Sequence, residues 1–205
     1  MKKVYLEQWN LFKQSYWKLF VGLLILFILS SVAVYFFMLK NEALVTTLMK
    51  QVSKMFEEKD LIDPDTSAIE LAFGLFKNNT MACLLLFVSG FLPIFLPAIG
   101  IIVMNSAIMG IMFAYMTLTG QAILPMLFAG IIPHGIFEIP AIILAGTLAF
   151  YLSIGIFRKI NDARFSFKNC ATNSIKTFVF VCVPLLVIAA IVEAFITPIF
   201  LGMLV

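Results

Sequence analysis

The amino-acid sequence predicts an all-α, polytopic helical bundle embedded in a membrane. Of its 205 residues, 62% are hydrophobic and only 12% are charged, a balance far outside that of soluble globular domains. The apolar residues form long continuous runs rather than the alternating segments of about ten residues that mark outer-membrane barrels. We therefore expect about five transmembrane helices in a single membrane domain that comprises residues 1–205.

The N-terminal segment, residues 1–18, is predicted to be an amphipathic interfacial helix. Aromatic residues recur there at helical spacing while lysines occupy other positions; the aromatic residues are Tyr5, Trp9, Phe12, Tyr16 and Phe20. Residues 19–39 carry no charge, and the hydrocarbon core of a bilayer requires about 20 apolar helical residues. Since this run is too long for a signal peptide and lacks a small-residue cleavage site, we expect it to be retained as the first span.

Residues 40–77 are predicted to form an extracytoplasmic helical loop with two short helices. The first has an apolar stripe made of Leu44, Leu48, Val52 and Met55. The second begins in "SAIELAFGLF", where Ser67 and Glu70 have the spacing of a capping box. Asn78 and Asn79 are expected to cap the second span, which should occupy residues 80–96.

Prolines and glycines predict where the later spans begin and end. Gly90, Pro93, Pro97 and Gly100 separate the second span from a third at residues 98–118. The stretch "AILPMLFAGII" is too short to cross the membrane before Pro133. We expect it to be a broken half-helix that dips into the membrane or lies at its surface. The fourth span should then begin at residues 136–140 and end at Phe157, and the fifth should occupy residues 177–203.

The charged residues predict the orientation of the chain. Residues 1–18 have four lysines and one glutamate, a net charge of +3; residues 40–77 have five lysines and seven acidic residues, a net −2; residues 158–176 have five basic residues and one aspartate, a net +4. Cytoplasmic loops are enriched in lysine and arginine. We therefore expect a multi-pass protein of the cell (cytoplasmic) membrane with a cytoplasmic N-terminus and an extracytoplasmic C-terminus.

The basic loop at residues 158–176 is expected to contact anionic lipid rather than nucleic acid. Its contacts should come from Arg158, Lys159, Arg164 and Lys168.

Three ionisable residues are predicted to lie at membrane depth, namely His134, Glu138 and Glu193. A charge in the centre of a bilayer costs roughly 2.5 kcal/mol or more, so each is a candidate functional residue. His134 and Glu138 are four residues apart and would share one helix face, which suits a proton relay, a cation site or a substrate-binding pair. The two glutamates are expected at a similar depth, in the outer half of the bilayer.

A structural role for Glu138 competes with these functional ones. Pro140 is tolerated in the first turn of a helix, where its missing N–H costs no hydrogen bond. That position would place Glu138 at a helix N-terminus, where a carboxylate accepts free backbone N–H groups. We favour such capping, or bonding between helices, over a transport or catalytic role. Asn105, Gly110 and Gly146 indicate close helix approach with polar contacts between spans.

No enzyme motif is present: the chain has no HExxH, CxxC, GxSxG or glycine-rich phosphate loop. A lone histidine argues against a protein-only zinc site. Cys83, Cys170 and Cys182 are widely separated, and we expect reduced structural thiols. We therefore expect no enzymatic activity, no cofactor and no metal. The small-residue faces permit a homodimer without requiring one.

The motifs "PHGIFEIPAIILAG" and "IVEAFITP", with an Asn-Asn pair before the second span and a polar Asn105 in the third, resemble the stage II sporulation protein M (SpoIIM) family. The resemblance extends over about residues 10–205 and is closest to the broad branch outside sporulation. It implies a set of signature residues: Asn79, Asn105, Pro133, His134, Gly135, Glu138, Pro140 and Glu193. It also implies a polytopic membrane protein without a catalytic centre. The namesake anchors a complex with peptidoglycan-degrading proteins in the membrane during engulfment.

Three hypotheses for the function follow. The first is a membrane scaffold that binds membrane or cell-envelope proteins through its outside helices and lateral surface. The second is a channel or transporter in which His134, Glu138 and Glu193 line a polar cavity. The third, which the motifs support least, is an intramembrane enzyme.

Overall fold

The computed structural model describes residues 2–57 and 66–203, and all regular structure in this part of the chain is helical. The elements, with π-helical turns labelled η, are α1 (Lys2–Leu11), η1 (Phe12–Tyr16), α2 (Trp17–Leu39), α3 (Glu42–Glu57), α4 (Ala68–Ser89), α5 (Leu96–Leu118), α6 (Ile123–Met126), η2 (Leu127–Ile131), α7 (Ile132–Asn161), α8 (Phe167–Thr177), η3 (Phe178–Cys182), α9 (Val183–Ile191), η4 (Val192–Ile196) and α10 (Thr197–Gly202).

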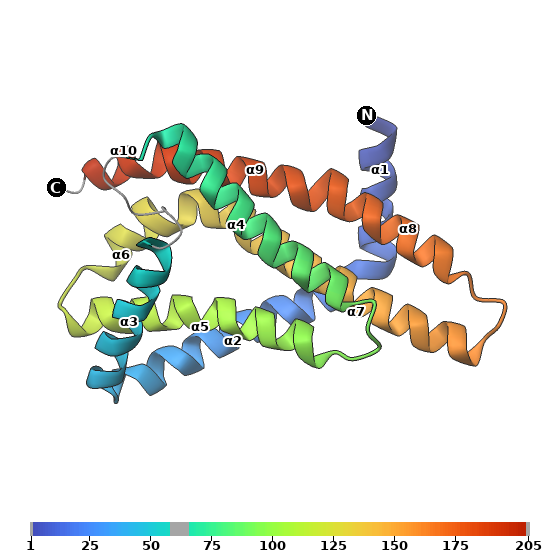
Figure 1. The fold of residues 1–205 in the computed structure, drawn as a ribbon, viewed down its shortest axis with the longest axis horizontal. Helices are drawn as coiled ribbons and strands as arrows, with labels where there is room; N and C mark the ends of the chain where they lie inside the picture. The colour runs from blue at the N-terminus through green and yellow to red at the C-terminus, as the bar shows by residue number, and fades with distance from the viewer. Residues whose placement is uncertain (1, 58–65, 204–205) are drawn as a thin grey trace.

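Within the described residues, five helical segments are long and apolar enough to cross a membrane, which confirms the predicted helical bundle. They are Lys2–Leu39, Ala68–Ser89, Leu96–Leu118, Ile123–Asn161 and Phe167–Gly202. Figure 1 shows α1 in the half of the bundle that carries the α7–α8 connection, and the C-terminus with the α5–α6 connection at the opposite end. The two basic segments therefore lie in the same half of the bundle.

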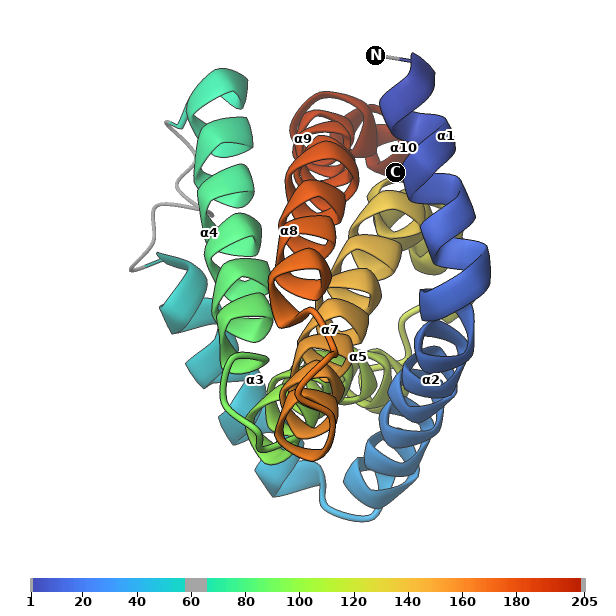
Figure 2. The same ribbon diagram turned by 90° about the vertical axis from the view of Figure 1, so that its right-hand side faces the viewer.

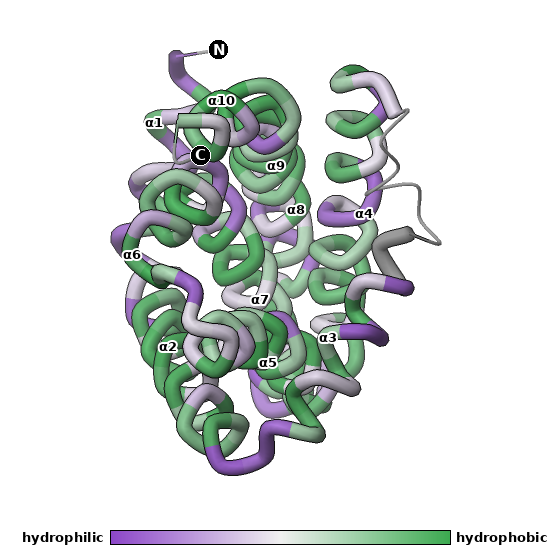
Figure 3. Tube along the Cα trace, turned by 90° about the vertical axis from the view of Figure 1, so that its left-hand side faces the viewer, coloured by the Kyte–Doolittle hydropathy of each residue, from purple (hydrophilic) through white to green (hydrophobic). Residues whose placement is uncertain are grey.

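Helix α7 is the centre of the bundle. It contacts α2, α4, α5, α8 and α9, and Figure 2 shows it between α4 on one side and α2 on the other. Figure 3 shows hydrophobic residues along α2, α5 and α7, whereas hydrophilic residues gather in the connections and on α3. A central helix with neighbours all around must be apolar on every face.

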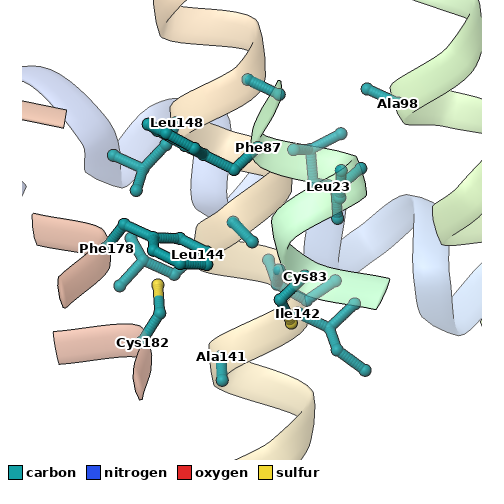
Figure 4. Packing of buried hydrophobic residues seen from close by; sticks show 14 of the residues in the cluster. Leu23, Cys83, Phe87, Ala98, Ala141, Ile142, Leu144, Leu148, Phe178 and Cys182 are labelled. Atoms are coloured by element: carbon teal, nitrogen blue, oxygen red, sulfur yellow. The ribbon is translucent and has the colours of Figure 1, made fainter. Parts of the chain in front are cut away.

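The core around α7 is apolar and closed. Its fully buried side chains include Ile143, Leu148 and Leu152. Figure 4 shows Leu144 and Leu148 of α7 packed with side chains from α4 and from the last helical segment. The rings of Phe87 and Phe178 stack there, with centroids 4.9 Å apart. Such packing leaves no room for a column of water between these helices.

Glycines allow the helices to approach closely, as predicted for Gly110 and Gly146. A Cβ atom at Gly110 would lie 2.5 Å from the backbone oxygen of Ser31 in α2, and one at Gly146 would lie 2.6 Å from the side chain of Ile102. A Cβ at Gly90 would come within 2.4 Å of the Cα of Ala149. These contacts lie within the membrane-spanning bundle, where small residues let backbones meet.

Serines rather than Asn105 provide the polar contacts between spans. The Asn105 Nδ2 donates to the carbonyl of Ile101 in its own helix, at 2.8 Å. The next residue, Ser106, is hydrogen-bonded to the hydroxyl of Ser30 in α2 at 2.6 Å. The Ser153 hydroxyl donates to the carbonyl of Gly90, at 3.1 Å, joining α7 to the end of α4. The expected role of Asn105 between helices was therefore wrong, although the type of contact was right.

The N-terminal segment has an exposed aromatic face, as predicted for an interfacial helix, but it also makes buried contacts with the bundle. Its exposed aromatic residues include Trp9, which is 58% exposed. Gln8, in contrast, is buried, and its Oε1 accepts a hydrogen bond of 2.6 Å from the hydroxyl of Thr177. Tyr16 is fully buried, with its ring edge-to-face against Tyr151. The predicted aromatic stripe therefore divides into an exposed part and a packed part.

Helix α4 corrects the boundaries predicted for the second span. The capping box of Ser67 and Glu70 is present, but the helix that it starts continues to Ser89 and is itself the span. Asn78 and Asn79 lie in the middle of this helix rather than at its start, so the prediction that they cap the second span is wrong. Helix α3 confirms that the first of the two helices predicted in residues 40–77 is present, although the side chain of Met55 lies outside the described part.

The fourth span also begins earlier than predicted. The broken half-helix expected before it is wrong, because α6, η2 and α7 form one continuous helical segment, Ile123–Asn161; α7 starts at Ile132 with Pro133 in its first turn and Pro140 inside. The expected start at residues 136–140 is therefore wrong, as is the end at Phe157. Glu138 lies two turns into a helix and cannot cap it.

Wide π-helical turns explain how these helices continue through prolines. The turns η2, η3 and η4 each end two residues before a proline, namely Pro133, Pro184 and Pro198. Proline clashes with the carbonyl of residue i−4 in a regular α-helix, and a π turn widens the backbone at that point. The last helical segment also begins at Phe167 rather than at residue 177, so the predicted basic loop is largely helix.

Candidate functional site

His134, Glu138 and Glu193 form one cluster. Each offers a ligating atom, and these atoms all lie within 4.8 Å of one another. His134 and Glu138 are one turn apart on α7, and Glu193 reaches them from η4 of the last segment. The structure thus brings together the three ionisable residues that the sequence places at membrane depth, including the two glutamates expected at a similar depth.

Glu193 lies in a stretch of wide helical backbone. It belongs to the π turn η4, in which the backbone N–H of Thr197 donates to the carbonyl of Val192; the Thr197 hydroxyl donates to the same carbonyl, at 3.3 Å. The π turn η2 ends shortly before His134. Single π turns inside α-helices are found frequently at functional sites, and here they flank the cluster in both helical segments.

The cluster is half-buried and carries unpaired polar groups. The Nδ1 atom of His134 is buried and has no hydrogen-bond partner. The carboxylates of Glu138 and Glu193 are close enough to repel one another when charged. No lysine or arginine of the described residues compensates the charge of either carboxylate. Two carboxylates in an apolar environment must be neutralised, either by protonation or by a compensating positive charge. The arrangement is therefore suited to hold a cation.

Helix α4 lies beside the cluster, and two of its residues there were not predicted from the sequence to belong to this site. Cys83 is fully buried and close enough to Glu138 to feel its charge. Thr80 lies three residues earlier on α4, and its buried hydroxyl has no partner. Residues three apart share a helix face, so Thr80 and Cys83 lie on one face of α4. The sequence did not predict this shared face, because the second span was expected to begin only at residue 80, whereas α4 begins at Ala68.

The cluster is closed toward the basic end of the bundle. Between Glu138 and Tyr151, Thr147 is the one polar side chain of α7, and its hydroxyl donates to the carbonyl of Ile143 in the same helix, at 2.8 Å. Ala141, Ala145 and Leu148 are fully buried in the same stretch. The polar groups of the cluster are thus confined to the end of the bundle that carries the C-terminus.

The other signature residues lie outside the cluster of ligating atoms. Asn79 is in α4, where its Oδ1 accepts a hydrogen bond from Asn78 at 3.4 Å. Pro133 and Pro140 shape α7. A Cβ at Gly135 would meet only ordinary contacts of 3.7 Å, so packing does not explain a glycine there.

The residues predicted to contact lipid remain on the surface at the opposite end. Arg158 and Lys159 end α7, Arg164 lies in the connection and Lys168 is in α8; all four are exposed. This placement fits a solvated basic face at a membrane surface.

Comparison with known proteins identifies the relationship of the chain. The model of the family described as SpoIIM, stage II sporulation protein M, matches residues 23–198. The matched range includes α7 and the cluster residues. Among curated proteins and among solved structures, no match was found.

Proposed function

Because the chain belongs to the stage II sporulation protein M family, we propose that it is a non-enzymatic membrane scaffold that anchors partner proteins of the cell envelope. The observation that carries the proposal is the closed apolar core of α7. A transporter needs a polar or water-filled route from one side of the membrane to the other. From Glu138 toward the basic end of the bundle, the described residues of α7 have buried aliphatic side chains instead.

The surface for partners is proposed on α3, the start of α4 and the lateral face of the bundle. Ile69 and Phe73 lie on the first turns of α4 and are 74% and 68% exposed. They lie toward the end of the bundle that is opposite the basic segments (Figure 1). Exposed aromatic and aliphatic residues near a membrane surface suit contact with another protein.

A channel or transporter is the second candidate, and the cluster itself favours it. Ionisable residues inside a membrane commonly mark ion or proton pathways. His134, Glu138 and Glu193 would then form the binding site of such a pathway, entered from the end of the bundle that carries the C-terminus.

Flux measurements in proteoliposomes separate the two candidates. We expect the wild-type protein, Glu138→Gln and Glu193→Gln to give the same ion conductance and proton leak as protein-free liposomes. The two substitutions should instead alter assembly, seen as a changed size-exclusion profile, because each replaces one of the carboxylates that meet where α7 and η4 pack together. A leak through the wild-type protein that both substitutions abolish would overturn the scaffold in favour of transport.

A further inference from the structure

We propose that His134, Glu138 and Glu193 bind one divalent transition-metal ion, of the Zn²⁺ or Mn²⁺ class, which joins α7 to η4. The proposal goes beyond the scaffold function and does not depend on it. It also departs from the expectation drawn from the lone histidine, because the third ligand comes from a distant segment that only the folded chain brings near.

The distances suit a metal site whose side chains close around the ion. The ligating atoms lie within 4.8 Å of one another. A tetrahedral ion bound at roughly 2.1 Å requires ligands roughly 3.4 Å apart. The ligating atoms must approach one another by at most about 1.4 Å, and rotation of the flexible glutamate side chains can supply this movement. His134 and Glu138 already face one another on consecutive turns of a rigid helix.

The unpartnered histidine nitrogen is the second observation. A buried ring nitrogen normally finds a hydrogen-bond partner, because an unsatisfied buried polar atom is costly. The Nδ1 of His134 has none, although a nitrogen of the same ring lies within 4.8 Å of both carboxylates. A neutral imidazole with a free lone pair is a common metal ligand, so an ion between the three side chains would satisfy the nitrogen.

Charge balance points to a divalent ion. In the ionised form that binds a metal, the two carboxylates carry two negative charges, and no lysine or arginine of the described residues compensates them. One M²⁺ ion with a neutral histidine gives a site of zero net charge. Neutrality matters here because an uncompensated charge within a bilayer is expensive.

The donor atoms select the class of ion. One imidazole nitrogen and two carboxylates form a mixed nitrogen and oxygen set, which suits Zn²⁺, Mn²⁺ and their neighbours. Ca²⁺ and Mg²⁺ prefer oxygen ligands alone. No thiol belongs to the set, so ions that require sulfur are disfavoured. Three protein ligands leave at least one position for water.

Metal analysis of the purified full-length protein tests the proposal. The wild-type protein in detergent is stripped with a chelator, incubated with Zn²⁺ or Mn²⁺ alone, washed and measured by elemental analysis. We expect about one ion per chain, since the three ligands form a single site. Mutation of residues that do not bind the metal themselves, but hydrogen-bond to its ligands, already weakens metal binding about 10–100-fold. Loss of a ligand in His134→Gln, Glu138→Gln or Glu193→Gln should therefore weaken binding ~100-fold or more.

A matched control is Glu7→Gln, which removes an exposed carboxylate of α1 far from the cluster in sequence; this variant should bind as the wild type does. Bound metal should also raise the thermal unfolding temperature of the wild type but not of the three ligand variants. Absence of stoichiometric binding to the wild type would overturn the proposal. Binding that survives in all three ligand variants would do the same, because the ion would then lie elsewhere.

Cobalt substitution tests the wild-type protein itself, so the outcome does not depend on whether a variant folds. Co²⁺ at this site should give visible absorption bands of a nitrogen and oxygen ligand field. A strong thiolate-to-cobalt charge-transfer band, or no spectrum beyond that of hydrated Co²⁺, would contradict the assigned ligands.

Discussion

Gly110→Ala should destabilise the bundle by about 1–3 kcal/mol, the usual cost of forcing extra atoms into a packed interface. The added methyl group would lie 2.5 Å from the Ser31 carbonyl oxygen, 3.0 Å from the Cβ of Val34 and 3.1 Å from the Tyr35 nitrogen. All three atoms belong to the rigid frame of α2, so no flexible side chain can move aside. Helices α2 and α5 must separate, and their contacts weaken together.

Gly100→Ala is the matched control, because it lies in the same helix and a Cβ there meets nothing within 4 Å. Alanine favours a helix over glycine by about 0.8–1 kcal/mol, so this variant should be neutral or slightly more stable. The measurement is the free energy of unfolding in a denaturing-detergent titration. Equal effects of the two substitutions would show that α2 and α5 do not pack as described.

Leu148→Ala should cost about 2 kcal/mol of stability, the low end of the range for leucine truncation in a packed core. Leu148 is fully buried in the centre of α7, and the neighbouring helices cannot collapse into the space. The low end applies because helices that separate within a bilayer still lie in apolar surroundings. The substitution therefore loses packing contacts, but it loses little free energy of transfer of the side chain out of water.

Leu29→Ala is the comparison for this cavity. Leu29 lies on α2 and is 62% exposed on the apolar surface, where lipid chains can replace the missing atoms. We expect a change within about 0.5 kcal/mol, as for surface substitutions generally. The same unfolding titration measures both variants. A large effect at Leu29 with none at Leu148 would contradict the central position of α7.

The number and type of the spans could be predicted from the sequence because the bilayer demands long apolar helices. Residues 19–39 and 98–118 are uncharged and mostly apolar, and the structure has helices at both. The boundaries near prolines could not be predicted. Whether a proline ends a helix depends on the backbone before it, and a π turn such as η2 leaves no clear mark in the residue pattern.

The candidate site was predictable in part. The spacing of His134 and Glu138 predicts their shared face, and depth counting places Glu193 at a similar level. The capping role of Glu138 was wrong because Pro133, rather than Pro140, occupies the first turn of α7. That Glu193 meets the other two depends on the packing of η4 against α7, a contact between distant segments that no local pattern encodes.

The closed core around α7 is the central claim, and the native cysteines test it most directly. Cys83 borders the cluster and Cys182 lies opposite on the last segment; both are fully buried, and Cys170 is nearly so. Membrane-impermeant thiol reagents should label none of them from either side of the membrane until the protein is denatured. Ser166→Cys and Thr119→Cys, exposed at opposite ends, should each react from one side only. Labelling of Cys83 from both sides in the native protein would reveal a water-filled path past the cluster and contradict the closed scaffold.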